Sequence, residues 1–130
     1  MILGWLSLRV RHPEEVAAWY EKLGLQISAG RPEAGTVIVG TQDRGRIIVL
    51  IPGDPLEHSE RLQLHLAVPD VDAKYSKLKR AGIEFTEPPR DMPWGWRHVY
   101  TRDPAGHVVE LCSPLPAATD RDSQLLRSSH

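Results

Sequence analysis

The chain has 130 residues, of which 41% are hydrophobic and 25% charged, and its formal net charge is −1. This length and composition predict one globular domain with a hydrophobic core of its own. The near-neutral charge gives no electrostatic basis for binding nucleic acid or an anionic membrane. The single cysteine, Cys112, excludes an internal disulfide and a cysteine-rich zinc site. No apolar run is long enough to span a bilayer and no signal-type segment is evident, so we expect a cytoplasmic location.

The first 52 residues predict the order β-α-β-β-β. Residues 5–10 alternate apolar and polar side chains, as a strand with one buried face does. Pro13 suits the first position of a helix and Gly24 suits its end, which predicts a helix over 13–23. Three short apolar segments bounded by turn residues then predict strands over 25–30, 36–41 and 46–52.

The same order returns after a polar connector. Residues 62–68 predict a strand, and Asp70 is placed to cap a helix over about 71–80 that Gly82 ends. A strand over 83–87 and a loop are expected next. A hairpin then closes the pattern, with strands over 96–102 and 107–113 around the turn Asp103-Pro104-Ala105-Gly106.

An internal repeat follows from this order. A shift of 58 residues superimposes Leu6 on Leu64, Val10 on Val68 and Gly24 on Gly82. We therefore predict one domain over 1–116, made of module one (2–52), a linker (53–61) and module two (62–114). Residues 117–130 are polar and aperiodic and are predicted to be a flexible tail.

Two β-α-β-β-β modules that contain "AAWYEKLGL", "LHLAVPDVDA" and "RDPAGHVVEL" resemble the vicinal oxygen chelate superfamily. That superfamily includes glyoxalase I, bleomycin- and fosfomycin-resistance proteins and extradiol dioxygenases. The resemblance covers roughly Ile2 to Pro114. It implies an α+β fold of two tandem βαβββ modules whose sheets curl around a shared cleft. It also implies a homodimer.

The resemblance further implies where a metal would bind. Catalytic members carry ligands in the first and last strands of each module, which correspond here to Trp5, Val49, Gln63 and Glu110. Trp5 and Val49 offer no donor, so no metal cofactor is favoured. If a divalent metal does bind, Gln63, His65 and Glu110 are its expected ligands.

Glu110 raises a separate question, because a carboxylate in an apolar strand needs a partner. If Arg102 pairs with His107 in the closing hairpin, Arg97 shares a face with Glu110 and His98 points away. Arg97 is then the expected ion-pair partner of Glu110. Both residues also fit the polar floor of a ligand site, together with Gln63 and His65.

Two tryptophans stand in a loop where polar residues were expected. Trp94 and Trp96 in "PPRDMPWGW" either cap the core or form an aromatic wall, and "PWG" before the last hairpin resembles bleomycin-resistance proteins. With Trp5 they suit a ligand that is aromatic or antibiotic-like. The first hypothesis is therefore metal-independent small-molecule binding by Trp5, Gln63, His65, Trp94, Trp96, Arg97 and Glu110.

Two alternatives remain open from the sequence. One is a lyase or dioxygenase-like enzyme that depends on a divalent metal, in which Glu110 is catalytic as a ligand or general base. The other is a cleft filled by side chains, in which dimer formation is the only function. The identity of the ligand does not follow from these residues.

Overall fold

A computed structural model describes residues 1–28, 35–58 and 61–116 of the chain. The predicted tail, 117–130, lies outside the described residues, as do the end of the predicted strand 25–30 and part of the linker. The chain divides into two compact units. The first unit covers 1–59 together with 103–106, and the second covers 60–102 and the residues from 107 onward.

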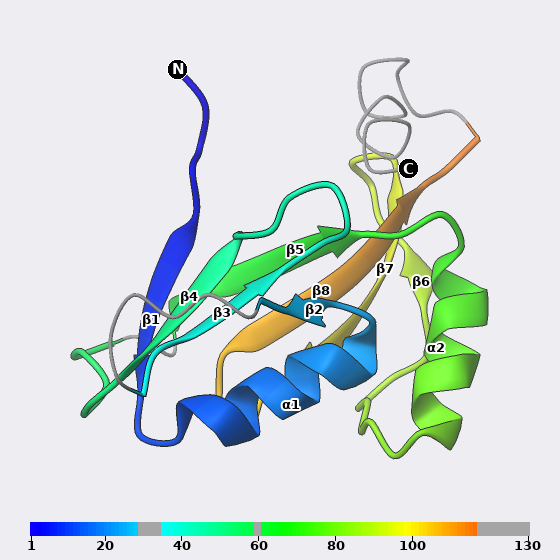
Figure 1. Ribbon diagram of the computed structural model, residues 1–130. Coiled ribbons are helices and arrows are strands. Elements are labelled where there is room, and N and C mark those ends of the chain that lie inside the picture. The colour runs from blue at the N-terminus through cyan, green and yellow to red at the C-terminus, as the bar shows by residue number, and fades with distance from the viewer. Residues whose placement is uncertain (29–34, 59–60, 117–130) are drawn as a thin grey trace. The chain divides into compact units, whose positions relative to one another are not determined.

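The first unit is the βαβββ module expected from the sequence. Its elements are β1 (Leu6–Val10), α1 (Pro13–Leu23), β2 (Gln26–Ile27), β3 (Val37–Gly40) and β4 (Ile48–Pro52). They form a four-stranded sheet in the order β1-β4-β3-β2, with β1 parallel to β4 (Figure 1). The helix has the predicted bounds, and Gly24 ends it in the left-handed conformation at φ 108°, which glycine adopts without steric cost.

The second unit repeats this order. Its elements are β5 (Gln63–Ala67), α2 (Val71–Arg80), β6 (Arg90–Asp91), β7 (Trp96–Arg102) and β8 (Val108–Pro114). The sheet order is β5-β8-β7-β6, with β5 parallel to β8 (Figure 1). Asp70 caps α2 as predicted, because its carboxylate accepts a hydrogen bond from the Ala73 amide.

One predicted strand is wrong. Residues 83–87 are not a strand; the third element of module two is instead Arg90–Asp91, within the segment expected to be a loop. The apolar residues of 83–87 serve packing rather than strand pairing. Ile83 is buried, and the Phe85 ring makes an edge contact with Tyr75 of α2 at 4.9 Å between centroids.

A buried hydrogen bond lies inside the first unit. The Tyr20 hydroxyl of α1 donates to Asp103 Oδ2 at 2.7 Å, and both residues are at most 4% exposed. The other oxygen of Asp103 accepts from the Ala105 amide. Asp103 thus has partners for both oxygens inside the protein, which its burial requires.

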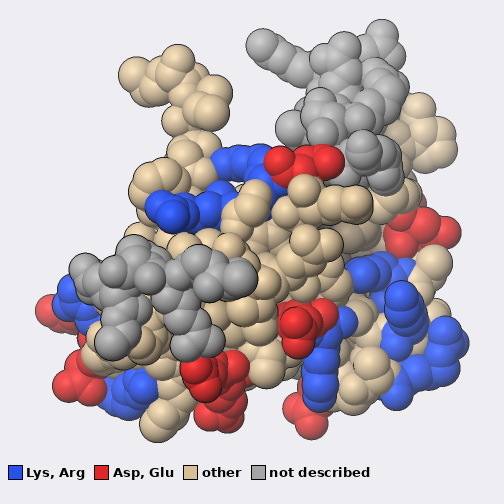
Figure 2. All heavy atoms as spheres, in the orientation of Figure 1, with Lys and Arg blue, Asp and Glu red and all other residues tan. Residues whose placement is uncertain are grey.

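Basic side chains gather on α2, which carries Lys74, Lys77, Lys79 and Arg80 (Figure 2). Burial and the charge of Lys77 lower the pKa of Lys74. Lys79 Nζ lies 5.5 Å from the centroid of the Tyr75 ring.

In the part of the chain that the structure describes, no helix combines the length and the hydropathy of a membrane span.

Candidate functional site

The two faces of the module-two sheet carry different chemistry. Strand alternation places Val99, Val109, Leu111 and Ser113 on one face, and Ser113 Oγ accepts from the Val71 amide at the start of α2. This first face is the one that α2 covers. The opposite face carries Gln63, His65, Glu110, His98, Tyr100 and Trp96, and we call it the Glu110 face.

Glu110 is the buried centre of that face. It is 2% exposed and sits in β8, between β5 and β7. His65 lies directly across from it in β5, and Tyr100 lies directly across in β7. A carboxylate at this depth is costly unless both oxygens have partners.

Two histidines satisfy Glu110. His98 Nδ1 contacts Oε1, and His65 Nδ1 contacts Oε2. The two imidazoles differ in exposure, because the His98 side chain is 2% exposed and the His65 side chain 56%. The arrangement is one buried carboxylate held between a buried histidine and a half-exposed one.

The predicted partner of Glu110 is therefore wrong. The hairpin pairs Arg102 with Val108, not with His107, so Tyr100 rather than Val99 faces Glu110. A slip of one residue turns every side chain of a strand to the other face. Consequently His98 points toward Glu110, where it was expected to point away, and Arg97 lies on the opposite face.

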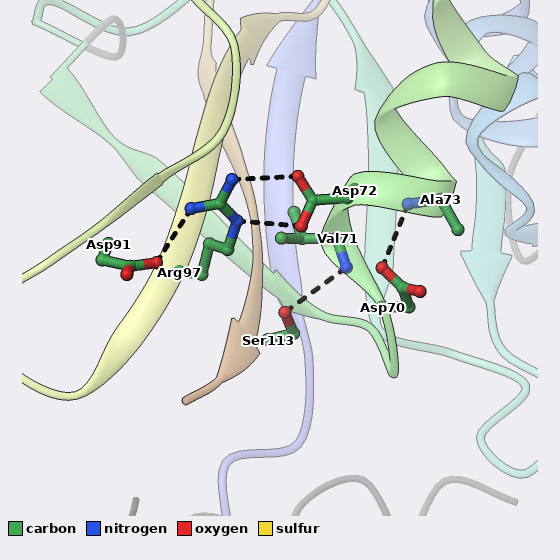
Figure 3. A network of polar contacts seen from close by, with 7 residues as sticks. All are labelled: Asp70, Val71, Asp72, Ala73, Asp91, Arg97 and Ser113. Carbon is green, nitrogen blue, oxygen red and sulfur yellow. Dashed lines mark hydrogen bonds and ion pairs between the residues drawn. The ribbon is translucent and has the colours of Figure 1, made fainter. Parts of the chain in front are cut away.

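Arg97 has other partners. Its guanidinium makes a bidentate pair with Asp72 of α2, at 2.8 and 3.0 Å, and a third contact with Asp91 of β6 at 2.9 Å (Figure 3). Hydrogen bonds to Asp72 and then Asp91 raise the pKa of Arg97 above its ordinary value. The residue links helix and strand on the α2 side and takes no part in the Glu110 face.

Aromatic rings flank the buried histidine. His98 makes edge contacts with Tyr100, at 4.5 Å between centroids, and with Trp94 at 6.0 Å. Trp94 is 60% exposed and Tyr100 is 37% exposed. Trp94 precedes Gly95, whose φ of 91° sharpens the turn into β7, and Trp96 shares the face of His98 by alternation. The Glu110 face therefore exposes aromatic rings to solvent around the polar cluster of Glu110 and its two histidines.

The remaining predicted residues lie in different places. Gln63 is exposed and lies two residues before His65 on the same face. Trp5 belongs to the first unit, where it stands one residue before β1, is 50% exposed and carries the Arg46 guanidinium 4.9 Å above its ring. Val49 is buried in β4. Module two alone brings together Gln63, His65, Trp94, Trp96 and Glu110.

Cys112 lies next to Glu110 on the same face. It is 9% exposed, and its thiol donates weakly to the Leu66 carbonyl at 3.7 Å. Burial, and then the Glu110 charge, raise its pKa to about 11. A thiol that stays protonated is a poor nucleophile, which agrees with a packing role.

The residues at the family's ligand positions do not fit a divalent metal. Trp5 and Val49 have no lone pair to give, and Gln63 offers only a neutral amide oxygen. Both oxygens of Glu110 already contact imidazole nitrogens. Over the described residues, no group of three or more His, Cys, Asp and Glu side chains has an arrangement that could hold a metal ion. That no metal is favoured stays a prediction.

Fold and site together define a class: an α+β protein of two βαβββ modules with a polar and aromatic face on the sheet of module two. The chain belongs to the Glyoxalase/Bleomycin resistance protein/Dioxygenase superfamily, whose model matches residues 2–111. The family resemblance inferred from the sequence is confirmed.

Relatives of this chain span several bacteria. It is 31% identical to the uncharacterized protein YetH of Bacillus subtilis (strain 168) over 98 residues, which are 72% of this chain and 81% of YetH. Among solved structures, TnmS3, an antibiotic binding protein from Streptomyces sp. CB03234, is 28% identical with a TM-score of 0.73. That match covers 88% of this chain and 97% of TnmS3. A superfamily protein from Nocardioides is 25% identical with a TM-score of 0.67, covering 92% of this chain and 88% of its own.

The sequence pattern alone does not place His98 and Tyr100 on the Glu110 face. The expected hairpin turns His98 to the other face and gives no role to Tyr100. The length of the hairpin connection decides which residues share a face. A four-residue turn, Asp103–Gly106, would pair Arg102 with His107, whereas a five-residue connection pairs Arg102 with Val108 and turns each side chain of β7 to the other side relative to β8. Only the paired register decides between them.

Proposed function

We propose that this protein binds an aromatic, antibiotic-like small molecule on the Glu110 face without the help of a metal. The observation that carries the proposal is the combination on one face of a satisfied polar centre, Glu110 with His65 and His98, and exposed aromatic rings. Small-molecule sites are typically apolar surfaces with a few fixed polar groups. Trp94, Trp96 and Tyr100 supply the stacking surface, and Gln63 and His65 supply polar contacts.

The similarity to a ligand-binding protein also supports this proposal. TnmS3, an antibiotic binding protein, shares 28% of its aligned residues and most of its length with this chain. Two of the four positions that hold metal ligands in catalytic members of the family are Trp5 and Val49 here, and neither side chain can coordinate a cation. This favours binding of a small molecule without a metal over metal-dependent catalysis. The resemblance to the family also leads us to propose a ligand-binding role for Trp5 of the first unit and a homodimer of the chain.

The direct test is a titration of purified protein with a panel of aromatic antibiotics in the presence of a chelator, with tryptophan fluorescence as the signal. Trp94→Phe and Trp96→Phe should each weaken binding by about three- to ten-fold, the loss expected for one aromatic contact. Trp19→Phe is the matched control, because the Trp19 ring makes an edge contact with Tyr20 within α1 of the first unit. It should leave the affinity unchanged.

A parallel titration with Ni²⁺, Zn²⁺, Mn²⁺ and Fe²⁺ tests the alternative of a metal-dependent lyase or dioxygenase. Saturable metal binding that Glu110→Ala abolishes would favour that enzyme and overturn metal-free capture. Ligand binding that is indifferent to the chelator supports capture. If no aromatic compound in the panel binds, and Trp94→Phe changes nothing, the proposal of ligand capture is wrong.

A further inference from the structure

The contacts of Glu110 determine which nitrogen of His65 carries a proton. An ionised carboxylate only accepts hydrogen bonds, and both of its oxygens contact an imidazole Nδ1. Each Nδ1 must therefore carry a hydrogen and donate. In a neutral imidazole the other nitrogen, Nε2, is then a bare acceptor. Glu110 thus selects the tautomer of both histidines.

The two bare nitrogens are not equally available. The His98 side chain is 2% exposed and is flanked by Trp94 and Tyr100. The His65 side chain is 56% exposed and lies on β5, an edge strand of its sheet. Because Nδ1 of His65 is turned to Glu110, its Nε2 lies on the far side of the ring. His65 therefore presents an oriented acceptor on the face that also carries the exposed aromatic rings.

We propose that His65 Nε2 accepts a hydrogen bond from a hydroxyl group on the ligand, and that the ligand class is hydroxylated aromatics such as phenols and hydroxyquinones. The inference rests on the proposed function and names its chemistry. A ligand carboxylate has no proton to give to Nε2. An ammonium group can also donate, but it loses more hydration beside aromatic rings than a neutral hydroxyl does.

The geometry also excludes Glu110 itself as the group that meets the ligand. It is 2% exposed and both of its oxygens are occupied. Its role is to position His65, as the carboxylate does in a carboxylate–histidine pair. Removing the carboxylate charge should therefore change ligand preference through His65.

The test compares naphthol with its methyl ether, which has the same rings and no hydroxyl proton. Wild-type protein should bind naphthol about three- to ten-fold more tightly, the factor that one net hydrogen bond in a half-exposed site supplies. His65→Phe should bind both compounds equally. Glu110→Gln should also lose the preference, because an amide donates to Nδ1 as readily as it accepts. Trp19→Phe, in α1 of the first unit, should keep it.

Nitrogen NMR of the imidazoles gives a second readout that does not depend on the variants folding identically. In the wild type, His65 Nδ1 should carry the proton, and naphthol but not its methyl ether should shift the Nε2 resonance. A proton on Nε2, or equal affinity for the two compounds, overturns the inference and leaves aromatic capture standing. If neither compound binds and neither shifts a resonance, aromatic capture fails and this inference fails with it.

Discussion

Tyr100 lies directly across from Glu110 in the β7–β8 hairpin, and this pairing decides which side chains share the Glu110 face. Because side chains alternate between the two faces of a strand, His98 lies on the same face as Tyr100, and its Nδ1 contacts the carboxylate. His65 reaches the same carboxylate from the parallel neighbour β5. Three strands thus contribute to one polar cluster around the buried Glu110.

Removing Glu110 should destabilise the protein. In Glu110→Ala the buried His98 loses its acceptor, and we expect the free energy of unfolding to fall by about 2–4 kcal/mol. Glu110→Gln keeps the volume and one acceptor oxygen and should lose less. Urea denaturation of the three proteins measures the difference. An alanine variant as stable as wild type would mean that the cluster contributes no net stability.

Arg97 should affect stability but not ligand binding. Its bidentate pair with Asp72 lies on the α2 side of the sheet and is partly exposed, so Arg97→Ala should lower the free energy of unfolding by only about 1 kcal/mol. Arg97→Lys keeps the charge but not the fork of donors and should recover part of that loss. The measurements are denaturation and the fluorescence titration. A large loss of ligand affinity in Arg97→Ala would contradict the assignment of faces.

Tyr20→Phe removes a buried hydrogen bond with almost no change in shape. Asp103 Oδ2 then loses its donor at 4% exposure, and we expect a loss of about 1–3 kcal/mol in the free energy of unfolding. Asp103→Asn keeps an oxygen for Tyr20 but turns its NH2 group toward the Ala105 amide, so it should also be destabilised. Thermal unfolding followed by circular dichroism orders the variants; a fully stable phenylalanine variant would mean that water replaces the lost donor.

Stability should fall in mildly alkaline solution because of Cys112. Its pKa is raised from 9.0 to about 11, mainly by burial and then by Glu110. A group with a raised pKa in the folded state stabilises fully below its unfolded pKa, and that contribution is lost as the pH rises toward the folded pKa. The unfolded chain therefore releases the thiol proton between about pH 9 and 11 while the folded chain retains it.

The matched variant for this effect is Cys112→Ser, whose hydroxyl does not titrate in that range. Denaturation midpoints should fall more steeply with pH in wild type than in the serine variant. Burial and Asp103 also raise the pKa of Tyr20, so both proteins should share the further loss above about pH 10. Parallel pH curves for the two proteins would contradict a buried, protonated Cys112.

The amino-acid sequence by itself determined the order of elements, the bounds of both helices and the repeat, because these depend on local signals. Pro13 and Gly24 bracket α1, Asp70 caps α2, and the turn Asp103-Pro104-Ala105-Gly106 marks the end of β7. The strand expected over 83–87 failed where a short apolar segment packs against α2 without joining the sheet. Local pattern alone does not distinguish those two uses of apolar residues.

What only the tertiary structure decided is the set of side chains that meet at Glu110. Glu110 itself stood out in the sequence as a carboxylate among apolar residues, but its partners depend on which residues pair across β7 and β8. A hairpin shifted by one residue exchanges His98 for Arg97 at the carboxylate, and both shifts fit the same turn sequence. The observed pairing buries Val99, Val109 and Leu111 against α2, which leaves the histidines, and not the arginine, on the Glu110 face.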